Sequence, residues 1–179
     1  MLKPEIISSE RLILRPFSND IINDNYLNWL NDDEITSYLE INGTYTLDML
    51  VNYVNLMIDK NVFIWAIFLK DGNKHIGNIK IDPINIKHKF GEYGIMMGAR
   101  SEWGKGYAFE ASSIVLNYCF QNMLLRKVCL GVINENIPAI SLYKKLGFKI
   151  EGIYKSHLLC NDQYSDCIRM AAFNPGIKF

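Results

Sequence analysis

The sequence lacks the features that mark membrane, secreted and nucleic-acid-binding proteins. No run reaches the roughly 18 apolar residues of a membrane span, and the opening Met1-Leu2-Lys3-Pro4-Glu5 has no signal-like apolar run. Lysine plus arginine and aspartate plus glutamate both number 19, so the formal net charge is zero. This balance argues against non-specific nucleic-acid binding as the main function, although it leaves room for a local basic patch. We expect neither a membrane nor a nucleic-acid partner.

Potential metal ligands are few and widely spaced. No pair of cysteines has the C-x-x-C spacing, and the histidines lie far apart in the sequence. The residues concerned are Cys119, Cys129, Cys160, Cys167, His75, His88 and His157. We therefore expect reduced thiols, mostly buried, in a cytoplasmic protein, and no metal.

The length and composition suit one folded domain. The chain has 179 residues, of which 49% are hydrophobic, so it can bury a sizeable core. It contains no repeat, no low-complexity segment and no linker rich in glycine, proline or serine. We predict a single domain over residues 1–179.

The first part of the chain predicts helices and then an antiparallel meander. Apolar spacing favours helices, with Thr46 as the cap of the third, and Asp71-Gly72 is a typical hairpin dipeptide. The expected elements are a strand over 12–17, helices over 20–30, 32–39 and 47–58, and strands over 62–69, 75–82 and 90–99.

The second part predicts alternating helices and strands. Asn136 is placed to cap a helix with Pro138 in its first turn, and Gly147 is placed to end it. The expected elements are a long helix after Gly106, a strand over 127–132, a helix over 136–146, and strands over 148–154 and 164–173 with a turn near 161–162. The fold class is mixed α/β (α+β).

A glycine turn separates the strand that ends near Ala99 from the long helix. A helix N-terminus offers unpaired N–H groups and partial positive charge, and glycine lets the backbone approach a phosphate. The Walker pattern fails because Ala99 and Gly106 occupy two of its fixed positions, and the dinucleotide pattern fails at Phe109. By itself, the turn around Gly104 is equally consistent with an ordinary tight connection.

Three segments together resemble the GNAT acetyltransferase superfamily. The turn Gly104-Lys105-Gly106-Tyr107-Ala108 is similar to the family's pyrophosphate loop, although Ser101 replaces the usual Gln or Arg. The segment from Asn136 to Phe148 resembles the family's N-x-x-A-x-x-x-Y-x-x-x-G-F pattern. The opening Ser9-Glu10-Arg11-Leu12-Ile13-Leu14-Arg15 resembles the Rim-type branch, which includes ribosomal-protein, spermidine and nucleotide-sugar acetyltransferases.

The resemblance implies acetyl-CoA as co-substrate and a mostly antiparallel central sheet flanked by helices. It also implies a splayed strand pair at the cofactor site, where backbone groups of the strand before the turn bind pantetheine. The cofactor-binding residues implied are Ile95, Met96, Met97, Ser101, Trp103, Gly104, Lys105, Gly106, Tyr107, Ala108, Asn136, Ala139 and Tyr143.

Acyl transfer to an amine needs a proton acceptor, a donor for the oxyanion and an acid near the departing thiolate. The resemblance places Tyr143 at the CoA sulfur as that acid; the alternative is a core tyrosine bonded to backbone. Glu92 is a candidate base, and a solvated carboxylate at the start of a strand is the alternative. Asp33, Glu34 and Glu40 are candidates for binding a cationic amine, although surface charge is their commoner role.

The sequence therefore predicts an N-acetyltransferase that acts on a primary amine, either of a small molecule or of a protein N-terminus. The alternative is a non-catalytic acyl-CoA-binding module on the same fold. The acceptor and the oligomeric state stay open, a homodimer included.

Overall fold

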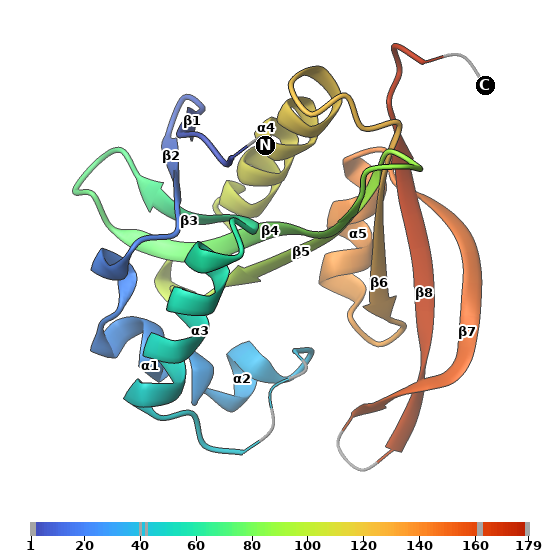
Figure 1. Cartoon of the computed structure of the whole chain (residues 1–179). Helices are drawn as coiled ribbons and strands as arrows, with labels where there is room; N and C mark the ends of the chain where they lie inside the picture. Colours follow the sequence, from blue (N-terminus) through green and yellow to red (C-terminus); the bar gives the residue numbers. More distant parts are fainter. Residues whose placement is uncertain (1–2, 40, 42, 161–162, 178–179) are drawn as a thin grey trace. The chain divides into compact units, whose positions relative to one another are not determined.

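The computed structural model describes residues 3–39, 41, 43–160 and 163–177, and these form two compact units (Figure 1). Unit 1 comprises Met1–Asp82 and Gly94–Ile114, and unit 2 comprises Pro83–Tyr93 and Val115–Phe179. The strands form one sheet of 8 in the order β1-β2-β3-β4-β5-β6-β8-β7. The sheet is mostly antiparallel, with a parallel pair at β5 and β6, so the predicted mixed architecture is confirmed.

The strands of unit 1 form an antiparallel meander. They are β1 (Ile7–Ser8), β2 (Leu12–Pro16), β3 (Phe63–Leu69) and β4 (His75–Asn85), which continues into unit 2 from Pro83. Six of the seven residues of β3 are buried, and the exception is Leu69. This burial explains the continuous apolar run of the strand. The turn between β3 and β4 has Gly72 at φ +69° and Asn73 at φ +50°, so the hairpin predicted from Asp71-Gly72 is confirmed.

The first helices of unit 1 are shorter than the sequence predicts, whereas the helix expected over 47–58 forms at nearly those bounds. The helices are η1 (Asn19–Ile21), α1 (Asp24–Leu30), α2 (Asp33–Thr36) and α3 (Leu47–Asp59). The single helix expected over 20–30 was wrong, because the extended backbone of Asn23 interrupts it and the Asn23 side chain accepts from Tyr26 N to start α1. Thr46 caps α3 as predicted, accepting from Met49 N.

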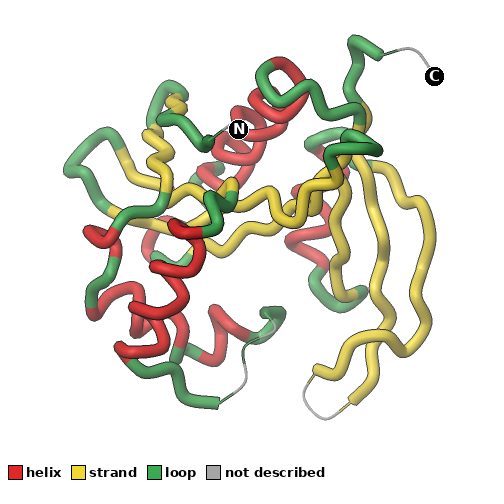
Figure 2. The backbone as a smooth tube through the Cα atoms, in the orientation of Figure 1, coloured by secondary structure: helices red, strands yellow, loops and turns green. Residues whose placement is uncertain are grey.

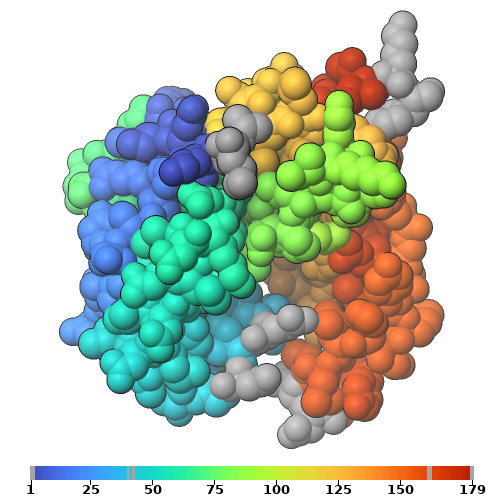
Figure 3. Space-filling model, in the orientation of Figure 1, coloured from blue at the N-terminus to red at the C-terminus, as the bar shows by residue number. Residues whose placement is uncertain are grey.

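Helix α3 lies in front of the strands of unit 1 in Figures 1 and 2. It buries Leu50 and Val54. The helical spacing of the sequence places Leu47 and Ile58 on the same face as these two residues, but in the structure they are 48% and 37% exposed. The buried face of α3 is therefore narrower than its apolar spacing predicts. Figure 3 shows α3 at the molecular surface.

Strand β5 (Phe90–Met97) leads into the glycine turn and ends two residues before the expected Ala99. The turn begins with η2 (Arg100–Glu102) and is followed by α4 (Tyr107–Gln121). Both β5 and α4 contribute residues to each unit.

Unit 2 holds β6 (Lys127–Ile133), α5 (Ile137–Lys145), β7 (Lys149–Cys160) and β8 (Gln163–Phe173), with β6, β8 and β7 side by side (Figure 1). Gly147 at φ +88° ends α5 as predicted. Strand β7 is longer than expected, because the register shift between Tyr154 and Leu158 lets it continue past Tyr154, with Ser156 at φ +47°. The turn expected near 161–162 lies outside the described residues.

Candidate functional site

The glycine turn gives α4 an open N-terminus. Gly104 and Gly106 have φ values of +76° and +84°, a conformation that L side chains rarely adopt. A Cβ on Gly104 would meet nothing within 4 Å, so space does not require the glycine there and backbone conformation does. The first N–H groups of α4 have no partner within the helix, so this turn can present them to an anion.

Two lysines flank this turn and share one carboxylate. Glu102 is buried and accepts from Lys105 Nζ and Lys74 Nζ, each at 2.8 Å. These bonds, that of Lys105 first, lower the pKa of Glu102 to about 2. Lys74 also donates to Ser101 Oγ at 3.0 Å. Ser101 therefore has a role within the turn, and Glu102 holds both lysine ends beside it.

The opening segment of the chain also contacts the turn and the start of α4. Glu110 of α4 accepts from Ser9 Oγ at 2.6 Å and from Arg11 Nε at 2.7 Å. Arg11 Nη1 donates to Lys105 O at 3.1 Å, and the guanidinium lies 4.5 Å from the centroid of the Tyr107 ring. The opening segment therefore fixes the start of α4. Sequence reasoning missed this role of Ser9 and Arg11, because their partners lie about a hundred positions away.

The end of β5 is tied to the turn by an indole. Trp103, which is 40% exposed, donates from Nε1 to Met97 O at 2.8 Å. That carbonyl already has a partner, whereas among the described residues no hydrogen bond outside the sheet involves the backbone of Ile95 or Met96. Strand β5 pairs with β6 in parallel register over Phe90–Glu92 and Lys127–Cys129.

Helix α5 carries Asn136, Ala139 and the candidate acid. The Asn136 side chain accepts from Ala139 N at 3.1 Å, so both residues serve the helix start. Tyr143 is buried, with its ring 5.8 Å from those of Tyr93 and Phe148. Burial raises the pKa of Tyr143 to about 12. Its hydroxyl makes no hydrogen bond to any residue that the structure describes, so the alternative of a backbone-bonded core tyrosine is not found there.

Glu92 forms an ion pair on the other face of the unit 2 sheet. Its Oε1 accepts from Arg169 Nη2 at 2.6 Å, and both side chains are about one quarter exposed. Because successive residues of a strand point to opposite faces, Glu92 points away from the face on which Tyr93 meets Tyr143. The candidate base and the candidate acid therefore lie on opposite faces of β5.

Of the acidic residues expected to bind an amine, Glu34 is ion-paired. Arg100 of the turn pairs through Nη2 with Asp32 Oδ1 and through Nη1 with Glu34 Oε2, the latter at 2.8 Å. Asp33 lines a cavity of about 260 Å³ with Leu30, Asn31, Thr36, Ile41, Gly43 and Thr44. Glu40 lies outside the described residues.

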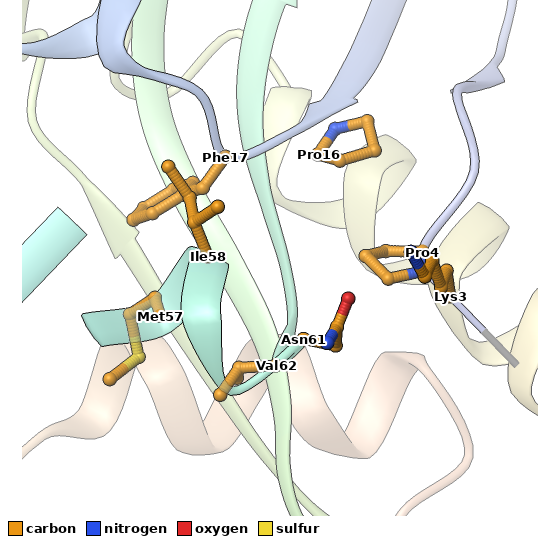
Figure 4. A pocket seen from close by; sticks show the side chains of 8 residues that line it. All are labelled: Lys3, Pro4, Pro16, Phe17, Met57, Ile58, Asn61 and Val62. Carbon is orange, nitrogen blue, oxygen red and sulfur yellow. The ribbon is translucent and has the colours of Figure 1, made fainter. Parts of the chain in front are cut away.

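A second cavity, of about 160 Å³, is lined by Lys3, Pro4, Pro16, Phe17, Met57, Ile58, Asn61 and Val62 (Figure 4). None of the predicted site residues is among these lining residues, whose polar members are Lys3 and Asn61. Within the described chain, no group of three or more His, Cys, Asp or Glu side chains could hold a metal ion. No helix there is long and apolar enough to cross a membrane, and Cys119 and Cys129 are buried free thiols.

Comparison with known proteins agrees with this geometry. Residues 11–149 match the family model described as an acetyltransferase (GNAT) domain. The chain belongs to the GNAT acetyltransferase family. The match includes the turn, Glu92 and Tyr143, and it begins at Arg11.

Individual GNAT relatives agree with this assignment. The chain is 37% identical over 103 residues to the spermidine N(1)-acetyltransferase of Escherichia coli (strain K12), covering 58% of this chain and 54% of that protein. It thus spans about half the length of this relative. It is 28% identical over 157 residues to an uncharacterized N-acetyltransferase, p20, of Bacillus licheniformis, covering 86% of this chain and 87% of the relative.

Solved GNAT structures share the fold. The spermidine N-acetyltransferase from Vibrio cholerae, solved in complex with CoA and spermine, superposes with a TM-score of 0.82 at 28% identity over 93% of this chain and 97% of that one. A GNAT-family acetyltransferase from Bacillus anthracis gives a TM-score of 0.84 at 24% identity, over 95% and 99% of the two chains.

Proposed function

We propose that the protein is an acetyl-CoA-dependent N-acetyltransferase that acetylates a primary amine of a small molecule or of a protein N-terminus. The observation that carries the proposal is the glycine turn before α4. Its two glycines have positive φ, and the cationic side chains of Lys74, Lys105 and Arg11 lie around it. Family membership adds support, and the reaction itself is our inference. The proposal includes a single catalytic domain over residues 1–179 and a cytoplasmic location.

The turn fits the pyrophosphate of CoA. Backbone groups from Ser101 to Ala108, with Trp103 and Lys105 at its rim, would hold the phosphates. Backbone groups of Ile95, Met96 and Met97 would bind pantetheine, although the Met97 carbonyl is shared with Trp103. Asn136 and Ala139 would border the thiol end by shaping the start of α5. The acetyl thioester supplies the electrophilic carbonyl.

The chain's own groups would then move one proton and stabilise two charges. The amine must lose a proton to attack, since an alkylammonium has a pKa of about 10. We assign that proton to Glu92, directly or through a water, and the second proton that the nitrogen loses after its attack passes to the departing CoA sulfur or to solvent. As the C–N bond forms and the C–S bond breaks, a backbone N–H of β5 would stabilise the oxyanion. The Tyr143 hydroxyl would donate to the departing thiolate. The base and the acid lie on opposite faces of β5. This placement suits the reaction, because the amine arrives from one side and the thiolate departs toward the other.

For the acceptor, the names of two relatives make spermidine the first compound to test. The ion pairs argue for a wider search. Arg100 pairs with both Asp32 and Glu34, which leaves one net negative charge there, and Arg169 pairs with Glu92, whereas a polyamine site gains most from unpaired carboxylates. A less cationic amine would suit these surroundings better.

The test is thiol release from acetyl-CoA with a panel that contains spermidine, an α-amino acid, an aminosugar and a peptide with a free N-terminus. We expect at least one amine to accelerate release and to be acetylated, as measured by mass spectrometry. If acetyl-CoA binds but no amine is acetylated, the protein is the non-catalytic acyl-CoA-binding module instead. A homodimer stays a prediction, which light scattering would check.

A further inference from the structure

Arg169 reaches Glu92 across an intervening strand. Arg169 belongs to β8 and Glu92 to β5, and β6 lies between these two strands in the sheet. Neighbouring strands are about 4.8 Å apart, so the side chain must extend over β6 for Nη2 to come within 2.6 Å of Glu92 Oε1. An arginine held in this way over a strand needs space on the strand beneath it.

Glycine on β6 provides that space. Gly131 and Gly152 are the register partners of Arg169 on its two sides, on β6 and β7. A Cβ on Gly131 would lie 3.0 Å from Arg169 Nη1 and 2.9 Å from Cys167 Sγ, whereas a Cβ on Gly152 would meet nothing within 4 Å. The guanidinium therefore leans over Gly131, on the side toward Glu92. Neither glycine has a positive φ, so close approach, and not backbone strain, explains Gly131.

The other groups on this face leave the second carboxylate oxygen of Glu92 available. The Tyr154 ring lies 5.8 Å from Arg169 Cζ, and Lys127 pairs with Glu151 at 2.6 Å, so the other charged pair is satisfied separately. Cys129, opposite Glu92 in register, is buried. Among the described residues, nothing donates to Glu92 Oε2, since Arg169 uses Oε1.

We propose that Arg169, seated over Gly131, is the positioning residue for the catalytic carboxylate of Glu92. The guanidinium fixes Oε1 and thereby aims Oε2 at the amine or at its bridging water. This inference rests on the proposed function, because it needs Glu92 to accept the proton of the acceptor amine. Arg169 itself touches neither reactant.

The test compares Arg169→Met, Arg169→Lys and Glu92→Gln in steady-state acetylation of spermidine, or of the panel amine with the fastest thiol release. We expect Arg169→Met to lower kcat about tenfold or more with an unchanged KM for acetyl-CoA, because a misplaced base slows the chemical step alone. Arg169→Lys should recover part of the rate, since the charge returns without the planar fork. The double variant of Arg169→Met with Glu92→Gln should be no slower than Glu92→Gln alone.

The two glycines supply matched controls. Gly131→Ala should lower kcat in the same direction as Arg169→Met, while Gly152→Ala should match the parent enzyme. Melting temperatures of all variants would separate misfolding from misplacement.

Four outcomes would overturn the proposal. The first is a normal kcat in Arg169→Met, and the second is multiplicative losses in the double variant. The third is a fully active Glu92→Gln variant, which would show that Glu92 is not the base although the protein does transfer acetyl groups. The fourth is a parent enzyme that acetylates no amine of the panel, which removes the proposed function itself.

Discussion

Replacing Tyr143 by phenylalanine removes one hydroxyl from a packed cluster. The ring keeps its contacts with Tyr93 and Phe148, each with centroids 5.8 Å away. The hydroxyl has no hydrogen-bond partner among the described residues, so the free energy of unfolding should change by less than about 1.5 kcal/mol. The variant thus isolates the chemical role of the phenol.

The size of the effect follows from the pKa of Tyr143. Burial raises it to about 12, while a thiol has a pKa of about 8.5, so full proton transfer to a thiolate would be uphill by ~5 kcal/mol. We therefore expect the phenol to donate a hydrogen bond to the developing thiolate and to keep its proton. A hydrogen bond to a charged group contributes about 1.5–3 kcal/mol, which corresponds to a loss in kcat of about 10- to 150-fold.

The assay is single-turnover acetylation of the best panel amine, with acetyl-CoA affinity measured by calorimetry. Turnover should fall in Tyr143→Phe while affinity stays the same, because the interaction forms mainly in the transition state. Tyr93→Phe, in the same aromatic cluster, should retain the parent rate. An unchanged rate for Tyr143→Phe in a step limited by chemistry would refute the reasoning and leave Tyr143 as a core residue.

Three further predictions concern the turn. Saturating acetyl-CoA should raise the melting temperature, because a ligand that binds only the native state stabilises it, and differential scanning fluorimetry would show the absence of any shift if the turn binds no CoA. Gly106→Val should weaken CoA binding more than Gly72→Val, a control with a similar positive φ (+84° against +69°), and equal affinities would make the turn purely structural. The pKa of Glu102 is lowered to about 2, so its ion pairs stabilise the fold above pH 4.5, the ordinary value, and lose this effect as the pH falls toward 2. Glu102→Gln should therefore flatten the loss of stability in that range, as measured by urea unfolding at each pH; a slope equal to that of the parent would contradict this.

Local signals predicted the helix caps, the hairpin and most of the elements correctly. Thr46 and Asn136 were identified as caps from residue type and spacing alone, since a cap bonds within three residues. The Asp71-Gly72 hairpin and the left-handed Gly147 follow from the same short-range chemistry. The helix expected over 20–30 failed for a related reason, because apolar spacing gave no sign that Asn23 would start a new helix.

The sequence by itself therefore determined the order of elements, the glycine turn and the position of Tyr143 on its helix, because each depends on neighbours a few residues away. Only the tertiary structure decided which charges meet. Glu92 pairs with Arg169 across 77 positions, and Glu110 binds Arg11 across 99. The first contact depends on strand order, register and Gly131 at the crossing point, and the second joins α4 to the opening segment. No local pattern encodes either contact, because each arises only when distant segments pack together.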